Sequence, residues 1–244
     1  MSSGLILITG ANGGIGQFIA QYLLSKGIRN IVCHYRTEND QILELFKKFD
    51  LDPEKHSVQA NLVDENSVQA MGNFVKKELG SVSGLINVAG SSSNSMSWKM
   101  SKNEFMKVIE DNLLSSFLCS KQFIPDMREN KFGRIINFSS IVGFTGMAGA
   151  SHYCSAKAGL VGLTKSLSLE LAPKNITVNS IALGYFNTGL IDEVSQDLQT
   201  DIKKKIPLGR FGEQQEIGAA VTYLLSPESQ YYTGQTMHLN GGQF

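Results

Sequence analysis

Seven short runs of apolar residues, rich in Val and Ile, recur along the chain and are separated by longer, more polar segments. They cover residues 5–9, 30–35, 57–60, 84–88, 134–138, 177–183 and 236–239. Segments between them carry apolar residues at helical spacing, for instance from Ile15 to Leu24 and from Leu160 to Leu171. Continuous apolar strands that alternate with helices are typical of a parallel sheet covered on both faces.

This alternation predicts the α/β class, with an open, doubly wound parallel sheet of the Rossmann type and about seven strands, because crossovers between parallel strands are right-handed. No repeat and no linker-like tract divides the 244 residues, so we expect one domain over residues 1–244. Ligands of such sheets bind at the carboxyl ends of the strands. Functional residues are therefore expected just after strands or in the first turns of helices.

Charge and cysteine content narrow the class of protein. The 22 Lys and Arg balance 22 Asp and Glu, which argues against a generally basic nucleic-acid binder. No run approaches the roughly 18 apolar residues needed to cross a membrane. Cys33, Cys119 and Cys154 are widely spaced, so the sequence predicts neither a disulfide framework nor a metal site, and a cytoplasmic location is the default.

A glycine cluster follows the first predicted strand and opens the first predicted helix: Thr9-Gly10-Ala11-Asn12-Gly13-Gly14-Ile15-Gly16. A glycine-rich turn here lets main-chain N–H groups and the helix N-terminus approach a pyrophosphate. The alternative is a helix start that merely tolerates glycine. The position at the first strand and helix favours dinucleotide binding.

The residue about 20 positions beyond this turn decides between the two dinucleotides, since an acid there suits the ribose of NAD and an arginine suits the 2′-phosphate of NADP. The residue is Arg36, and no acid precedes Glu38. Guanidinium matches phosphate geometry. We therefore expect NADP (NADPH) rather than NAD, against the alternative of a solvated arginine at a strand end.

Tyr153 and Lys157 are four residues apart and share one face of a predicted helix. An ammonium beside a phenol is expected to lower the phenol pKa, so that the tyrosine can exchange a proton. Tyr22 and Lys26 have the same spacing, but Tyr22 lies about 12 Å down its helix from the strand ends. Tyr153 lies near the start of its helix, so only Tyr153 is placed for chemistry.

Ser139 and Ser140 follow the fifth predicted strand and are expected at the same edge of the sheet. A hydroxyl there suits a hydrogen bond to a substrate carbonyl, although serine is also common in turns at strand ends.

Together these residues resemble the short-chain dehydrogenase/reductase family over the chain from Leu5 to its end. The resemblance rests on the following motifs: Thr9-Gly-x-x-x-Gly14-Ile15-Gly16, Asn87-Val-Ala-Gly90, Asn112, Ser140, Tyr153-x-x-x-Lys157 and Leu183-Gly184. The C-terminal stretch from Pro207 to Gly242 resembles that of bacterial 3-oxoacyl-[acyl-carrier-protein] reductases.

The resemblance implies the chemistry of NADPH-dependent carbonyl reduction. It makes Tyr153 the proton donor, Ser140 the group that orients the carbonyl, and Lys157 the residue that lowers the tyrosine pKa and binds the nicotinamide ribose. It also implies that Asn112 holds a water molecule, which links Lys157 to solvent as a proton relay. A mid-helix Asn without a partner is otherwise a poor helix former.

The same resemblance implies a set of cofactor contacts and three departures from the family pattern. Leu183 replaces the usual proline, Val88 an asparagine, and Gly13 a basic residue found in many NADP-dependent members. The first departure loosens the segment that leads to Phe186 and Thr188. The implied cofactor-binding residues are Gly10, Asn12, Gly14, Ile15, Gly16, Arg36, Asn61, Asn87, Gly90, Tyr153, Lys157, Phe186 and Thr188. Asp64, close behind Asn61, is instead expected to cap the next helix.

Substrate and assembly are expectations from the resemblance alone, because the family shares chemistry and not substrate. Lys131 and Lys174 match basic positions that bind an acidic acyl carrier protein, which favours 3-oxoacyl thioesters of fatty acid synthesis. Alternatives are a small ketone, diketone, sugar or alcohol, or a non-catalytic dinucleotide sensor. A substrate lid is expected around residues 187–206, with Leu190, Ile191 and Val194 lining an apolar pocket. A homotetramer is expected through the helices of Asn112 and Tyr153 and the C-terminal strand.

Overall fold

The structure is a computed structural model that describes residues 4–37, 40–188, 191 and 195–244. One seven-stranded sheet forms its centre, in the order β3-β2-β1-β4-β5-β6-β7, and every neighbouring pair is parallel. The strands are β1 (Leu5–Thr9), β2 (Ile31–Tyr35), β3 (Ser57–Gln59), β4 (Val82–Asn87), β5 (Gly133–Ser140), β6 (Ile176–Leu183) and β7 (Thr236–Leu239). The seven predicted strands and the doubly wound α/β class are thereby confirmed.

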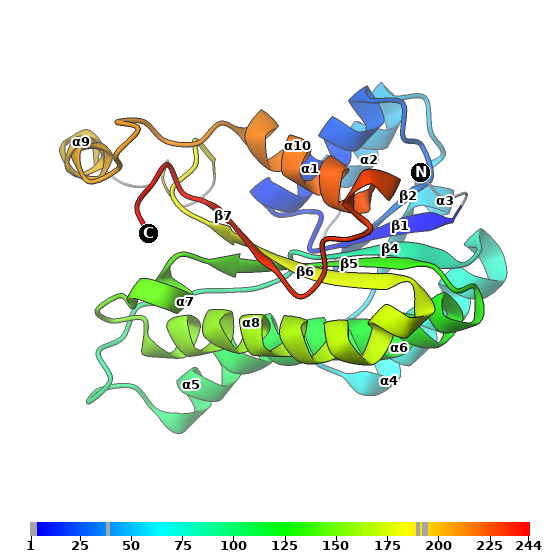
Figure 1. Ribbon diagram of the computed structural model, residues 1–244, viewed down its shortest axis with the longest axis horizontal. Coiled ribbons are helices and arrows are strands. Elements are labelled where there is room, and N and C mark those ends of the chain that lie inside the picture. The colour runs from blue at the N-terminus through cyan, green and yellow to red at the C-terminus, as the bar shows by residue number, and fades with distance from the viewer. Residues whose placement is uncertain (1–3, 38–39, 189–190, 192–194) are drawn as a thin grey trace.

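Helices cover both faces of the sheet (Figure 1). The α-helices are α1 (Gly14–Ser25), α2 (Asp40–Lys48), α3 (Pro53–His56), α4 (Glu65–Phe74), α5 (Lys102–Ile109), α6 (Ser115–Glu129), α7 (Val142–Thr145), α8 (Ser151–Leu171), α9 (Gln196–Lys204) and α10 (Gln214–Leu225). Two π-helical turns, η1 (Val75–Leu79) and η2 (Glu110–Leu114), continue α4 and join α5 to α6. Among the described residues, η3 (Ala172–Lys174) and η5 (Pro227–Ser229) are 3-10 turns.

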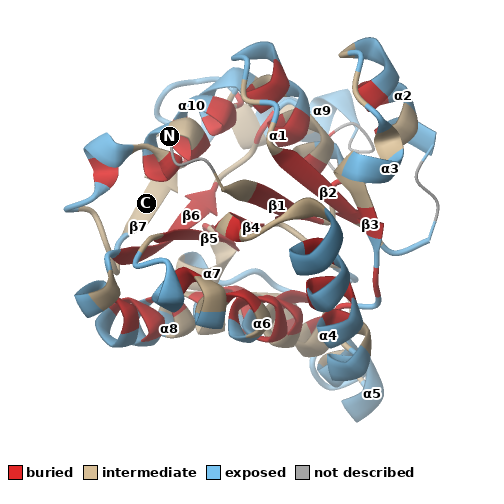
Figure 2. Ribbon diagram, turned by 90° about the vertical axis from the view of Figure 1, so that its right-hand side faces the viewer, coloured by how far each residue is buried: buried red, intermediate tan, exposed pale blue. Residues whose placement is uncertain are grey.

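Two hydrophobic clusters hold these layers together, one on each side of the sheet (Figure 2). Ile19 and Leu23 of α1 and Val221 of α10 belong to the cluster on one side. Phe123 of α6 and Leu167 of α8 belong to the cluster on the other. Within the described residues, no helix combines the length and apolar character needed to span a bilayer.

The strand order places a topological switch between β1 and β4, since the chain leaves β1 towards β2 and later returns to the other side of β1. In an open parallel sheet this is the point where a crevice forms at the carboxyl ends of the strands. The glycine turn after β1 and the segment after β4 both begin there. The site is therefore built around this edge of the sheet.

Candidate active site

Close main-chain approaches shape the glycine-rich turn between β1 and α1. Gly10 has a φ of +63°, and a Cβ at this residue would lie 2.7 Å from the Cα of Ala89. A Cβ at Gly16 would lie 2.5 Å from the carbonyl oxygen of Gly10. On the side of β4, Thr9 Oγ1 accepts hydrogen bonds from the N–H groups of Val88 (3.0 Å) and Ala89 (3.2 Å). Glycine is therefore required here to bring the turn, β4 and α1 together.

The N-terminus of α1 fits the pyrophosphate of a dinucleotide. Gly13 precedes the helix without a side-chain cap. Among the described residues, no acceptor is bonded to the N–H groups of Gly14, Ile15 and Gly16. Asn12, Gly13 and Gly14 are exposed. Free N–H donors at the positive end of a helix dipole form a suitable cradle for phosphate oxygens.

The predicted adenosine contacts lie at the ends of β2 and β3. Arg36 is exposed just beyond β2, and its NH1 lies 3.9 Å from Oδ1 of Asp111 in η2. Asp111 is 10% exposed and accepts a 2.6 Å hydrogen bond from the Ser91 hydroxyl. Asn61 is exposed after β3, where its main-chain N–H donates to Ser67. Asp64 caps α4 by accepting from the N–H of Asn66, as the sequence predicts.

The structure separates the two serines at the end of β5. Ser139 is buried, and its hydroxyl donates to the carbonyl oxygen of Lys157 at 2.8 Å, so it joins β5 to α8. Ser140 ends the strand, and its hydroxyl lies close enough to the hydroxyl of Tyr153, in the first turns of α8, to act on the pKa of that tyrosine. Ser140 is therefore the serine that faces the tyrosine.

Lys157 lies one turn further along α8 and is 5% exposed. Its Nζ donates to the carbonyl oxygen of Phe138 at 2.8 Å and lies 5.4 Å from the centre of the Tyr153 ring. Ser140, Tyr153 and Lys157 thus converge at the carboxyl edge of β5. The other pair with this spacing, Tyr22 and Lys26, packs between helices: the Tyr22 ring lies against Gly218 of α10, and Lys26 lies over the same ring.

The expected lowering of the tyrosine pKa is not found. Burial raises the pKa of Tyr153 to about 12, and the neighbouring Cys154 adds to this, while the nearby Ser140 hydroxyl acts in the opposite direction. Burial also lowers the pKa of Lys157 to about 8. The physical reason is that both groups are removed from water, which disfavours their charged forms.

Asn112 lies in the π-helical turn η2 and is 1% exposed. Its Nδ2 donates to the carbonyl oxygens of Ser91 (2.7 Å) and Val108 (2.9 Å). A Cβ at Gly90 would collide with its Oδ1. Gly90 therefore leaves the space that this side chain occupies, and π-helical geometry turns the asparagine towards the segment after β4.

Asn87 differs from the expected cofactor contact because its side chain is buried in a polar network. Its Nδ2 donates to Asn137 Oδ1 on β5 at 2.9 Å, and Nδ2 of Asn137 donates to Thr164 Oγ1 on α8 at 2.9 Å. The chain joins β4, β5 and α8 beneath the site. The Asn87 side chain, 2% exposed, holds the strand ends in register and does not reach the surface of the crevice.

Phe186 and Thr188 follow β6. Phe186 is 7% exposed, and its ring packs against Gly212. The two residues form a short parallel bridge, in which the N–H of Asn187 donates to the Gly212 carbonyl oxygen and the N–H of Gly212 donates to the Tyr185 carbonyl oxygen, both at 2.9 Å. Thr188 is half-buried, and its N–H donates to the Phe186 carbonyl oxygen at 2.8 Å. Leu183 completes β6 opposite Ser140, and its carbonyl accepts from the N–H of Ile141 at 2.9 Å. The strand is thus regular where the family usually has proline.

The expected lid falls partly outside the described residues, which include neither Leu190 nor Val194. Ile191 is buried with Ile206 and Phe211, beside Tyr185 and Ile202. This cluster anchors α9 against the segment after β6.

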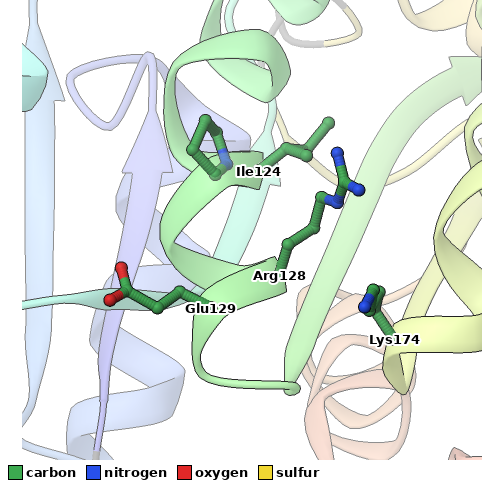
Figure 3. Close-up of a pocket in the computed structure, with 5 residues that line it drawn as sticks. Ile124, Arg128, Glu129 and Lys174 are labelled. Atoms are coloured by element: carbon green, nitrogen blue, oxygen red, sulfur yellow. The ribbon is translucent and has the colours of Figure 1, made fainter.

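Lys131 and Lys174 lie at the opposite edge of the sheet from Tyr153. Lys131 precedes β5, and Lys174 follows the 21-residue helix α8 that begins near Tyr153, which is a span of about 30 Å. Lys174 lines a hollow of about 380 Å³ with Ile124, Pro125, Arg128 and Glu129 (Figure 3). Arg128 and Lys174 point to one side of it and Glu129 to the other. Within one chain these lysines do not border the catalytic cluster.

Sequence reasoning missed two residues of this region. Asp111 faces Arg36, and a carboxylate directly before Asn112 in a helix gave no signal of that contact. His34 is 2% exposed beneath the glycine turn. A histidine in an otherwise apolar strand was the signal that could have identified it, because a buried polar ring needs partners.

Comparison with known proteins agrees with this geometry. Residues 10–243 match the family described as enoyl-(acyl carrier protein) reductase. The chain therefore belongs to the short-chain dehydrogenase/reductase family and is an oxidoreductase of that family.

Among its relatives are proteins named 3-oxoacyl-[acyl-carrier-protein] reductase FabG. The one from Staphylococcus aureus is 37% identical over 241 residues, which covers 98% of this chain and 97% of the relative. The one from Rickettsia conorii is 38% identical, with 97% and 95% covered. The one from Aquifex aeolicus is 36% identical, with 98% and 96% covered.

Proposed function

We propose that this protein is an NADPH-dependent carbonyl reductase that reduces 3-oxoacyl thioesters, carried by an acyl carrier protein, to 3-hydroxyacyl thioesters in fatty acid synthesis. The observation that carries the reductase assignment is that Ser140 and Tyr153 lie together beside the buried Lys157, at the strand edge that also bears the glycine turn. The names of the relatives support the thioester substrate.

In this proposal Tyr153 donates a proton to the oxygen of the substrate carbonyl as negative charge develops there. A tyrosine pKa raised to about 12 keeps the hydroxyl protonated, so it is ready to donate. Ser140 donates a second hydrogen bond to the same oxygen and thereby orients and polarises the carbonyl. Two fixed donors at the position of developing charge stabilise the transition state.

Lys157 and Asn112 support this donor. Burial lowers the pKa of Lys157 to about 8, so at neutral pH the side chain is mainly an ammonium, which favours the tyrosinate left after proton transfer. It also binds the nicotinamide ribose. Asn112 is proposed to hold a water that returns a proton from solvent through Lys157. Its amide is fixed for this role by the carbonyls of Ser91 and Val108.

The cofactor proposed for the crevice is NADPH rather than NADH. When bound, the nicotinamide supplies the hydride that reduces the carbonyl carbon. Main-chain groups of the glycine turn and the α1 N-terminus hold the pyrophosphate, Arg36 holds the 2′-phosphate, and Asn61 lies near the adenine. The segments after β4 and β6, at Gly90, Phe186 and Thr188, border the nicotinamide. Because Asn87 and Phe186 are buried, their contribution is to position main-chain groups.

The carrier protein is proposed to dock on Lys131 and Lys174. Since Lys174 lies about 30 Å along α8 from Tyr153 and Lys131 precedes β5, these lysines border an active site only if they belong to a second copy whose α8 runs antiparallel. This agrees with a homotetramer built through α6, α8 and β7. The exposed Phe117 on α6 and Leu169 on α8 favour such an interface. We further propose one domain, a substrate lid over residues 187–206, and a cytoplasmic location.

The test is NADPH oxidation with acetoacetyl-carrier protein and with a panel of small ketones, diketones and sugars, beside Tyr153→Phe as control. We expect turnover of the carrier thioester and a loss of about 100-fold or more in the variant, the size of a general acid contribution. If thioesters are inert while a ketone is reduced, the substrate assignment is wrong. If Tyr153→Phe retains full activity, so is the mechanism.

A further inference from the structure

His34 is a buried histidine in the middle of an apolar strand. It lies in β2 after Ile31, Val32 and Cys33, and its side chain is 2% exposed. A polar ring removed from water in this way costs free energy unless both nitrogens find partners. Its partners therefore indicate what the residue holds in place.

Both ring nitrogens are bonded to the main chain. The N–H of Gly10, in the glycine turn, donates to Nδ1 at 3.1 Å. Nε2 lies 3.0 Å from the carbonyl oxygen of Ala60, directly after β3. Because an N–H can only donate and a carbonyl can only accept, Nδ1 is unprotonated and Nε2 carries the hydrogen. The main-chain carbonyl of His34 also accepts from the N–H of Ala11 at 2.9 Å.

The ring thus connects the segments assigned above to the phosphate and adenosine end of the dinucleotide. Gly10 begins the pyrophosphate turn, Ala60 directly precedes Asn61, and Arg36 lies two residues beyond the histidine on the same strand. Thr9 fixes the turn from the side of β4, and His34 fixes it from the side of β2 and β3. The distance between the turn and the adenosine contacts is consequently set through the imidazole.

We propose that His34 is a positioning residue for the dinucleotide site: its neutral imidazole holds the glycine turn against the end of β3 and does not itself touch the cofactor. This proposal rests on the dinucleotide-binding part of the proposed function and is independent of the thioester substrate.

The surroundings keep the imidazole neutral. Burial lowers the pKa of His34 to about 4; the bond to Ala60 acts in the opposite direction, and the positive charge of Arg36 adds to the lowering. The groups that face the ring from the turn and from β3 are uncharged main-chain groups, and Arg36 is the charged group that acts on it. A second proton, on Nδ1, would point at the N–H of Gly10 and break that contact.

The decisive experiment measures the equilibrium dissociation constant of NADP⁺ for the purified full chain by fluorescence or calorimetry, without turnover. His34→Leu fills the buried position with an apolar side chain but removes both contacts, and it should weaken NADP⁺ binding at least tenfold. His34→Gln supplies one amide acceptor and one amide donor, and it should restore binding to within about threefold of the unmodified protein. For the Gln variant, kcat at saturating cofactor should stay within about twofold, since the catalytic cluster lies at the other end of the crevice.

His56→Leu is a matched control, because Nδ1 of His56 bonds the Ile31 carbonyl oxygen at 2.7 Å at the opposite end of β2. It should lower thermal stability and leave the NADP⁺ dissociation constant unchanged. Nitrogen NMR should also show the Nε2–H tautomer of His34 throughout pH 5.5–8.

Several outcomes would overturn the proposal. One such outcome is a folded His34→Leu variant whose dissociation constant for NADP⁺ equals that of the unmodified protein. Where that variant does not fold, His34→Gln decides: if it folds but binds at least tenfold more weakly, a donor and an acceptor are not what the site needs. An imidazole that titrates between pH 5.5 and 8 would also contradict it. If the unmodified protein binds neither NADP⁺ nor NAD⁺, the dinucleotide assignment itself fails, and this inference with it.

Discussion

The Nζ of Lys157 donates to the carbonyl oxygen of Phe138 at 2.8 Å while lying 5.4 Å from the centre of the Tyr153 ring. The lysine is almost completely buried, and its principal bond is to the main chain of β5. The fold therefore accepts a costly buried ammonium at the position where the proposed chemistry needs one, a frequent compromise at active sites.

Replacing this lysine should make the protein more stable and inactive. Burial lowers the pKa of Lys157 from 10.5 to about 8, so its protonated form disfavours folding by about 3 kcal/mol well below pH 8. Lys157→Met should raise the free energy of unfolding at pH 7 by about 1–3 kcal/mol, since the Phe138 carbonyl then loses its partner.

Denaturant unfolding of the cofactor-free protein at pH 7 and pH 9.5 checks this. The lysine binds fewer protons in the folded state than in the unfolded state between these pH values, so the unmodified protein gains stability relative to the variant as pH rises. The advantage of Lys157→Met should shrink accordingly. A variant that is less stable than the parent at pH 7 would show that the bond to Phe138 outweighs the cost of burial.

Gly90→Ala should disturb Asn112. The added Cβ collides with Oδ1 of that side chain, which cannot move without giving up its bonds to Ser91 and Val108. We expect a loss of stability of about 1–3 kcal/mol and reduced kcat. In an Asn112→Ala background the same glycine substitution should cost much less. Thermal unfolding of the four proteins in this cycle measures the coupling, and additive effects would contradict the contact.

Arg36→Ala should affect the binding of NADPH and of NADH differently. Loss of the guanidinium should raise the dissociation constant of NADPH about tenfold or more, as expected for a charge-assisted contact to phosphate, and change that of NADH little. Asp111→Asn removes the carboxylate 3.9 Å from this arginine and serves as the companion variant. It should leave NADPH binding intact or strengthen it. Equal effects of Arg36→Ala on both dinucleotides would remove the 2′-phosphate assignment.

Charge reversal at Lys131 and Lys174 tests whether the carrier protein docks on these two lysines. Lys131→Glu with Lys174→Glu should raise KM for an acyl carrier thioester several-fold, more strongly at low salt, because charges at an interface rim act mainly on encounter. KM for the matching coenzyme A thioester should not change. The same samples, examined by light scattering, should be tetramers. Activity of a monomer that remains sensitive to these lysines would refute docking across two copies.

The sequence was sufficient to predict the sheet, because strand patterning depends on local periodicity. It also predicted that Tyr153 begins its helix near the strand ends, where the structure has it beside Lys157. The difference between Tyr22 and Tyr153 followed from distance along a helix alone. Contacts between residues far apart in the sequence could not be predicted from local periodicity. The approach of Asp111 to Arg36 joins residues 75 positions apart. The burial of Asn87 and the raised pKa of Tyr153 depend on how completely α6 and α8 cover the strand ends.

The strand order also divides the crevice by chain segment. Everything proposed to hold the phosphates and adenosine lies in the chain up to Asn61, whereas the proposed proton donor and its supports come from the chain after β4. The two segments meet where Thr9 and Gly10 contact Val88 and Ala89. Replacing the chain up to Asn61 by that of an NAD-using relative, with these contacts preserved, should change the coenzyme preference of the protein. Its substrate range should stay the same.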